Sequence, residues 1–191
     1  MTTYTLFNQA NPGAVNSGAG NNGTNGLHFT VSTSCTMNGI WHYSPSSSTQ
    51  LPTSIALYTT QTSPSTGTLV TSNAASWSGA AGSGWAFASF TSPPSLSSGT
   101  DYMAANFRND ATNEWFVYYT VSWPVTSGVI TAPDDTSSGQ GWYNTGTSLT
   151  FPATQLAGNN FGMDVSVSTL FSIVPTVLSS GTQSVKRASY Y

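Results

Sequence analysis

The sequence predicts an all-β fold, an antiparallel β-sandwich of jelly-roll type that is followed by an extended C-terminal arm. Three observations lead to this prediction. Helical periodicity is absent, apolar and polar residues alternate in short runs, and clusters of Gly, Ser, Asn and Pro separate these runs at regular spacing. Eight or nine short strands joined by such turns are typical of sandwiches and jelly rolls.

The strand pattern recurs along most of the chain. It is clearest where Trp115, Val117, Tyr119, Val121 and Trp123 alternate, because these side chains would share one face of a strand. The expected strands are, in order, 27–33, 37–43, 54–59, 68–72, 85–91, 101–107, 115–123 and 161–168. The turn clusters between them are 11–26, 44–53, 61–67, 78–84, 92–99, 124–128 and 133–148.

Local sequence accounts for three of the connections. Asn38-Gly39 suits a positive φ, so it predicts a tight turn or a bulge. Pro93-Pro94 cannot donate to a central ladder, so it ends the strand that runs through Phe90. The segment 11–26 is low in complexity and predicts a long loop, either a linker or a surface contact loop.

A chain of 191 residues suits one domain with an arm. We place the sandwich at 1–168 and the arm at 169–191, where the strand pattern has ended. The arm is apolar at first and then basic and aromatic: Leu170, Phe171, Ile173, Val174, Val177, Leu178, Lys186, Arg187, Tyr190 and Tyr191. Two interpretations stay open, a frayed terminus and an arm that docks on a partner or a sister subunit.

Charged side chains are scarce. Residues 1–100 contain none, and the whole chain has three basic and six acidic residues with a net charge of −3. Acid–base and nucleophilic catalysis need titratable groups held close together, so this composition argues against an enzyme and predicts no cofactor. Nucleic acid is a poor partner because no basic patch is present, and no run of about 18 apolar residues predicts a membrane span.

The start of the chain and its single cysteine bear on the compartment. Residues 1–7 lack the basic and apolar regions of a signal peptide, although the neutral composition is typical of extracellular proteins. A virus particle would resolve this conflict, and so would truncation of a larger exported protein. Cys35 has no partner for an internal disulfide, and we expect it to be a small buried residue in a strand.

Several sequence blocks, taken in order, are similar to a family. They are Leu6-Phe7-Asn8 with Pro12; Gly26-Leu27-His28-Phe29-Thr30; Met37-Asn38-Gly39-Ile40-Trp41-His42-Tyr43; Ile55-Ala56-Leu57-Tyr58; Gly67-Thr68-Leu69-Val70; Gly84-Trp85-Ala86-Phe87-Ala88-Ser89-Phe90; Ser98-Gly99-Thr100-Asp101-Tyr102; Thr131-Ala132-Pro133; Phe151-Pro152; and Asn160-Phe161-Gly162-Met163-Asp164-Val165. Over residues 4–168 the set resembles a bacterial domain-of-unknown-function family that occurs in large cell-surface proteins beside immunoglobulin-like modules.

The resemblance implies a β-sandwich in an extracellular or virion setting, with no known catalysis. It fixes no ligand, so it supplies no binding residue. The chain departs from the family in its loss of charge and at Gly162-Met163, where the family tends to carry an aromatic and a branched residue. The arm after residue 168 lies outside the match.

Few residues could form a metal or catalytic site. Asp134-Asp135 could supply oxygen ligands to calcium, or it could form a turn, which is the commoner use of such a pair. His28 and His42 could meet across neighbouring strands, but no third metal ligand is evident. Asp164 has no carboxylate near it in sequence, so it predicts an internal hydrogen bond or an exposed group rather than catalysis.

Three aromatic residues have two possible roles, and capping of the sandwich is favoured over sugar binding because large aromatics usually bury most of their area. Trp77, Trp142 and Tyr143 lie in Gly- and Ser-rich segments, so they are candidate platforms for a sugar ring; the alternative is that Trp77 and Trp142 cap the ends of the sandwich. The remaining tryptophans of the strand pattern are expected in the core: Trp41, Trp85, Trp115 and Trp123.

Together these features predict a non-enzymatic structural protein on the surface of a bacteriophage virion. Capsid decoration or a minor capsid role is favoured over a tail role because the chain is short and single-domain. Its partners would be the major capsid protein or other virion proteins, and a homotrimer on a symmetry axis is compatible with this role. The alternative is a carbohydrate-binding module of a cell-surface or receptor-binding protein, with glycans as ligands.

Overall fold

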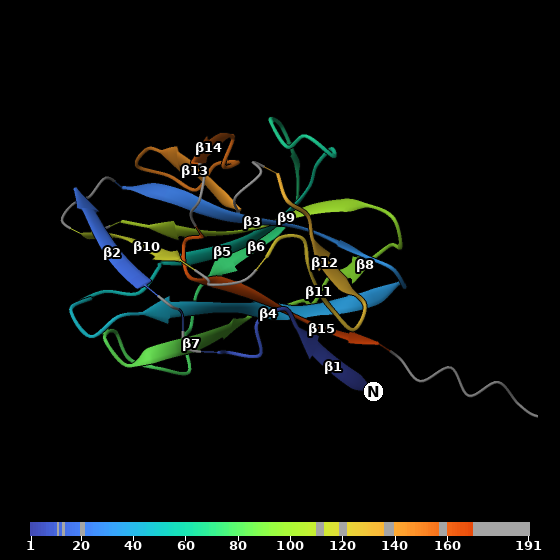
Figure 1. Cartoon of the computed structure of the whole chain (residues 1–191), viewed down its shortest axis with the longest axis horizontal. Helices are drawn as coiled ribbons and strands as arrows, with labels where there is room; N and C mark the ends of the chain where they lie inside the picture. The colour runs from blue at the N-terminus through green and yellow to red at the C-terminus, as the bar shows by residue number, and fades with distance from the viewer. Residues whose placement is uncertain are drawn as a thin grey trace, which may run out of the picture.

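Two antiparallel sheets form the two layers of this protein (Figure 1). The computed structural model describes residues 1–10, 12, 14–19, 22–109, 113–118, 122–135, 140–156 and 160–169, with backbone alone at 14–19 and 113–118. Within these residues every strand pairing is antiparallel and no helix occurs. The predicted antiparallel β-sandwich is therefore confirmed.

The first layer, sheet 1, contains both ends of the described sandwich. Its strands are, in spatial order, β1 (Thr2–Thr5), β15 (Met163–Thr169), β4 (Cys35–Ser44) and β7 (Gly84–Ser89), with the short β8 (Ser95–Leu96) also paired to β4. The first and last described strands are thus direct neighbours, with Thr2 opposite Thr169.

The second layer, sheet 2, is larger and carries two hairpins. Its main path is β11 (Val125–Ser127), β12 (Ile130–Ala132), β3 (Gly23–Val31), β9 (Asp101–Arg108), β5 (Ser54–Thr59) and β6 (Thr68–Ala74), and β13 (Gly141–Thr145) joins β3 to β14 (Thr154–Leu156). A separate pair consists of β2 (Ala14–Ala19) and β10 (Asn113–Tyr118).

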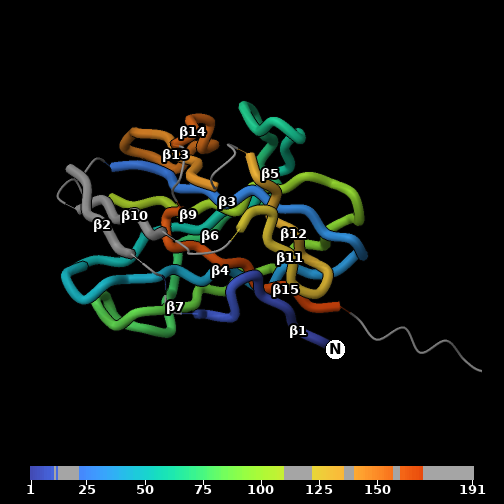
Figure 2. The backbone as a smooth tube through the Cα atoms, viewed as in Figure 1, coloured from blue at the N-terminus to red at the C-terminus, as the bar shows by residue number. Residues whose placement is uncertain are grey.

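The chain crosses repeatedly between the layers, as it does in jelly rolls. It passes from β3 in sheet 2 to β4 in sheet 1, returns for β5 and β6, crosses again for β7 and β8, and returns for β9. Figure 2 shows how the β11–β12 hairpin lies beside β15 and β1, so residues from both sheets meet at this end.

Alternation along the strands fills the space between the sheets. Met37 and Ile40 of β4 and Val165 of β15 are fully buried, and Leu27 and Phe29 of β3 face them from the other layer. Each such side chain contributes about 1.5–3 kcal/mol when it is removed from water. A smaller cluster lies on the other side of sheet 2 and consists of Ala56, Tyr58, Met103, Ala105 and Trp142.

The predicted irregularity at Asn38-Gly39 is confirmed as a bulge inside a continuous strand. Met37 pairs with Val167 and Gly39 pairs with Ser166, which leaves Asn38 as the additional residue. Gly39 also permits close packing, because a Cβ at this position would lie 2.1 Å from the carbonyl oxygen of Ala88 on β7.

Other expectations for the connections were wrong. The predicted long loop 11–26 contains β2 and the start of β3, because β2 finds its partner in β10, far along the chain. The expected strand 115–123 is observed only as β10, and the turn clusters 124–128 and 133–148 contain short strands of two hairpins. The side chain of Trp115 and residues 119–121 lie outside the described part.

The arm prediction concerns residues that the structure does not describe. β15 ends at Thr169, one residue beyond the expected boundary, and 170–191 follow outside the described residues. Across the residues that are described, no helix is long and apolar enough to cross a membrane.

Candidate functional site

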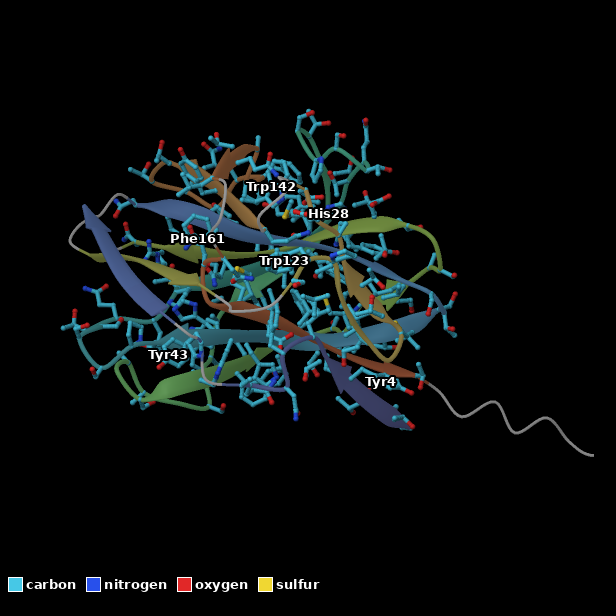
Figure 3. The ribbon with its side chains drawn as sticks, in the orientation of Figure 1. Tyr4, His28, Tyr43, Trp123, Trp142 and Phe161 are labelled. Atoms are coloured by element: carbon cyan, nitrogen blue, oxygen red, sulfur yellow. The ribbon has the colours of Figure 1, made fainter. Side chains whose placement is uncertain are left out.

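A buried histidine joins three separate parts of sheet 2. His28 lies on β3 in sheet 2, in the same part of the molecule as Trp142 (Figure 3). Its ring sits between Asp101 at the start of β9 and Asp135 in the segment after β12. Nε2 is 2.9 Å from Oδ1 of Asp101, and Nδ1 is 3.0 and 2.9 Å from the two carboxylate oxygens of Asp135. Both ring nitrogens therefore face carboxylate oxygens.

Neighbouring side chains complete this hydrogen-bond network. Trp142 on β13 donates from Nε1 to Oδ2 of Asp135 at 2.8 Å. Gln140 accepts from the backbone N–H of His28 at 3.0 Å and donates to the carbonyl oxygen of Pro133. The network connects β3 to residues 133–135, to Gln140 and to β13.

The network connects segments of the fold, and its geometry does not suit proton transfer to or from a substrate. The side chain of His28 is fully buried, and those of Asp135 and Asp101 are 5% and 20% exposed. A general base needs a ring nitrogen that can reach a substrate, whereas both nitrogens of His28 are engaged with internal partners. The arrangement can hold two strands and a loop together, because one imidazole ring contacts carboxylates from two separate segments.

A cleft of about 310 Å³ lies beside this network. Pro64, Asp134, Asp135, Trp142 and Gln155 contribute to its lining. The Asp135 carboxylate is already bound to His28 and Trp142, and Asp134 is exposed. No group of three or more His, Cys, Asp or Glu residues that could hold a metal ion occurs in the described portion of the chain.

The predicted sugar-binding aromatics have different environments. Trp142 is only 6% exposed and packs in the smaller cluster of sheet 2, so the expected open platform is wrong for this residue. Trp77 is half-buried, donates from Nε1 to the carbonyl of Pro52 at 2.6 Å, and packs beside the main core. Tyr143 is half-buried and lies 6.1 Å from the ring of Phe161. The structure does not bring the three together on one surface, and their carbohydrate-binding role stays a prediction.

The second histidine has a different environment from the first. His42 on β4 is buried, and its Nδ1 lies 3.4 Å from the side-chain nitrogen of Asn106 on β9. Burial, together with the charge of Arg108, lowers the pKa of His42 to about 3. His28 and His42 do not meet, because their side chains lie in different networks. The ring of His42 is therefore neutral near pH 7 and serves as an acceptor.

Replacing His42 by glutamine is expected to change the pH dependence of stability. Between pH 6.5 and about 3 the unfolded chain binds a proton that the folded protein excludes, so the wild type loses stability as pH falls. At about 1.4 kcal/mol per pKa unit, His42→Gln should gain roughly 2–3 kcal/mol relative to the wild type between about pH 7 and pH 4. Urea unfolding at both pH values measures this.

Asp164 also contributes to the pH dependence of stability, with a sign opposite to that of His42. Burial raises the pKa of Asp164 from 3.8 to about 6, so the folded protein binds the extra proton between these values and gains stability as pH falls. The effect of His42 is therefore isolated by the difference between wild type and His42→Gln. A difference that does not vary with pH would contradict the expectation.

Asp164 organises the backbone near the N-terminus. Its carboxylate accepts hydrogen bonds from the N–H groups of Leu6 at 2.8 Å, Phe7 at 3.0 Å and Val165 at 2.7 Å. These three hydrogen bonds act against the effect of burial on its pKa. The expected internal hydrogen bonding of Asp164 is thus observed, and no second carboxylate contacts it among the described residues.

Two cross-strand aromatic pairs occupy the outer face of sheet 1. Trp41 of β4 is opposite Phe87 of β7 with ring centroids 4.9 Å apart, and Tyr43 is opposite Trp85 at 5.4 Å. All four are half-buried, whereas their strand neighbours His42 and Ala86 point into the sandwich. The prediction that Trp41 and Trp85 are core residues is therefore wrong; the i, i+2 spacing of two aromatics on each strand was the signal that sequence reasoning missed.

The remaining predictions concern Cys35, Trp123 and the C-terminal arm. Cys35 is buried at the start of β4, and burial raises the pKa of its thiol, as expected for a structural cysteine. Trp123 is partly buried against the core and makes an edge contact with Phe7 at 6.0 Å. The arm residues fall outside the described residues: Leu170, Phe171, Ile173, Val174, Lys186, Arg187, Tyr190 and Tyr191.

Comparison with known families gives a match that spans most of the sandwich. A family model described as a domain of unknown function, DUF4082, matches residues 9–163. No curated protein matches the chain. The match covers the strands from β2 to β14 and the beginning of β15, including the His28 network and the aromatic pairs. The chain therefore belongs to the DUF4082 family.

Proposed function

We propose that this protein is a non-enzymatic structural protein of a bacteriophage virion, with capsid decoration or a minor capsid role favoured over a tail role. The supporting observation is how the titratable groups are used: His28, Asp101 and Asp135 bind one another, Asp164 binds backbone, and His42 is buried. Groups engaged in this way stabilise a module and leave it chemically inert. A surface that consists mainly of hydroxyl, amide and aromatic groups suits a position on the outside of a particle.

The assembly proposal follows from the arm. Its apolar residues and its basic pair, Lys186-Arg187, would attach the sandwich to the major capsid protein or another virion protein, with a homotrimer as a compatible assembly. The sandwich would then lie on the outside of the particle, with the arm between it and the capsid.

Purified particles test this proposal. Mass spectrometry of particles from the phage that encodes the chain should detect the protein in a fixed ratio to the major capsid protein. Particles that lack it should rebind the full chain but not a chain that ends after Thr169. Absence from purified particles would exclude the structural role, and rebinding of the truncated chain would exclude attachment through the arm.

A second candidate function is recognition of neutral glycans. The observation that favours it is the pair of cross-strand aromatic contacts on the outer face of sheet 1, Trp41 with Phe87 and Tyr43 with Trp85. Aromatic rings that are partly exposed and surrounded by hydroxyl groups offer both an apolar surface and hydrogen-bond partners. This function is compatible with a virion, since particles bind glycans on host surfaces.

A further inference from the structure

A second cleft, of about 440 Å³, lies at the edge of sheet 1, beside its edge strand β1. Tyr4 and Thr5 of β1, Ser166 of β15 and Trp41 of β4 form part of its lining, and Gln9 reaches it from the turn that follows β1. Figure 3 shows Tyr4 in the layer of sheet 1, away from His28 and Trp142. This cleft is therefore distinct from the one beside the His28 network.

The lining is uncharged. All the described side chains that line the cleft carry hydroxyl, amide or aromatic groups, and none carries a formal charge at neutral pH. Phosphate and carboxylate ligands would find no cation there to pair with. A ligand rich in hydroxyl groups would instead find hydrogen-bond donors and acceptors beside the aromatic side chain of Trp41.

The Gln9 amide has an unused donor at this cleft. Its Nε2 atom is buried and has no hydrogen-bond partner within the described structure. A buried donor without a partner costs about 1–3 kcal/mol, so such a group needs an explanation. This atom is out of contact with solvent, so the Gln9 side chain must turn toward the cleft before Nε2 can donate to a ligand oxygen and remove this cost.

The backbone that carries Gln9 is held in a strained conformation. Asn8 and Gln9 have φ values of 50° and 51°, in the left-handed region that few residues other than glycine adopt. Asp164 binds the N–H groups of Leu6 and Phe7 immediately before this turn, and Ala10 donates to the carbonyl of Phe7 at 2.9 Å. Such strain persists where the surroundings impose it, and it occurs preferentially at binding sites.

The aromatic side chains of Tyr4 and Trp41 are packed against neighbouring residues. The ring of Tyr4 lies against Gly128 in the β11–β12 turn, where a Cβ would come within 2.0 Å of the ring. Gly128 has a φ of +57°, so both the turn and the close approach favour glycine at this position. Trp41 packs against Phe87 of β7, with the ring centroids 4.9 Å apart. Both rings are therefore fixed before any ligand binds.

We infer that this cleft binds a neutral oligosaccharide. Trp41 supplies an apolar surface for the C–H face of a sugar ring, and Gln9 Nε2 donates to a ring or hydroxyl oxygen. Thr5 and Ser166 add hydroxyl groups at the sheet surface. The inference rests on the second proposed function, glycan recognition, and assigns it a site that includes neither Trp77, Trp142 nor Tyr143.

Calorimetric titration with hexasaccharides tests the inference on the full chain. The probes are the β-1,4-glucose, α-1,4-glucose, β-1,4-mannose and β-1,4-N-acetylglucosamine hexamers, with oligogalacturonate as the acidic comparison. Gln9→Asn retains an amide and a residue that tolerates positive φ, but it withdraws the donor by one methylene. We expect it to weaken binding of the preferred neutral hexamer about fivefold or more, the equivalent of one hydrogen bond of about 1 kcal/mol.

Gln155→Asn is the matched control, since Gln155 lines the other cleft and also has a buried Nε2 atom without a partner in the described residues. It should bind like the wild type, and Trp41→Leu should lose binding more strongly than Gln9→Asn. Thermal unfolding of each variant shows whether it is folded.

The outcomes separate the site from the function. If a neutral hexamer binds and only Gln155→Asn weakens it, recognition stands and the assignment to this cleft is overturned. If no neutral hexamer binds at millimolar concentration, glycan recognition and this inference fail together, whereas the virion proposal is unaffected. Tighter binding of oligogalacturonate would overturn the neutral ligand class.

Discussion

Replacement of Asp164 by alanine is expected to lower the free energy of unfolding by about 3 kcal/mol or more. The carboxylate accepts three backbone N–H groups, from Leu6, Phe7 and Val165, in a region that excludes water. Alanine would leave all three donors without partners, and each buried donor costs about 1–3 kcal/mol. Part of this cost would be relieved if water entered beside Leu6.

Asp164→Asn is expected to lower the free energy of unfolding less than Asp164→Ala does. Oδ1 accepts from Leu6 and Val165, and Oδ2 accepts from Phe7, so an amide oxygen in the Oδ1 position retains two of the three contacts. We expect a loss of about 1–2 kcal/mol for this variant.

Ser166→Ala is the control, because Ser166 lies on the same strand and face and its hydroxyl accepts from the Asn38 side chain. It should cost no more than about 1 kcal/mol. Urea unfolding at about pH 7 orders the three variants. Equal stability of Asp164→Ala and Ser166→Ala would show that the carboxylate does not hold the backbone at residues 6–7.

Replacement of His28 by alanine should be destabilising by about 3–4 kcal/mol. The imidazole lies between the carboxylates of Asp101 and Asp135, and its loss would leave two negative groups in a buried space without a donor between them. Repulsion between the carboxylates and their incomplete solvation then add to the lost packing. The three segments that meet at His28 would also lose their common contact.

Single substitutions of Asp101 and Asp135 measure how much each carboxylate contributes to the stability of the network. Asp135 is nearly buried and also accepts from Trp142, whereas Asp101 is 20% exposed, so Asp135→Asn should cost more than Asp101→Asn. Chemical denaturation, followed by the fluorescence of the tryptophans, measures each cost. A His28→Ala protein as stable as the wild type would contradict the view that this network holds β13 and the segment before it in place.

Alternation was sufficient to predict most long strands. In β4 and β15 apolar and polar residues alternate over several residues. Asn38-Gly39 marked the position of the bulge, although neither residue adopts the positive φ on which that prediction was based. The short hairpin strands β11 to β14 were missed because two or three residues give too little periodicity. β2 was missed because its composition is that of a loop and its partner β10 is distant in sequence.

The functional candidates were harder to predict. Period-two alternation separates two faces of a strand but does not identify which face is buried. Trp41 and Trp85 were assigned to the wrong side because the buried face of β7 carries the smaller residues Ala86 and Ala88. The partners of His28 are 73 and 107 residues away, a separation at which only the folded chain defines a contact. The Gln9 donor depends on the left-handed turn, and neither Asn8 nor Gln9 is a residue type that requires one.

The outer face of sheet 1 has a consequence for the conditions in which the protein works. The described side chains on this face, among them Trp41, Phe87, Thr5 and Ser166, are neutral, and the one carboxylate of the sheet, Asp164, is buried beneath residues 6–7. Contacts made by such groups have no ion atmosphere to lose or gain. The affinity of any ligand that binds this face through neutral groups should therefore be nearly the same in fresh water and in seawater.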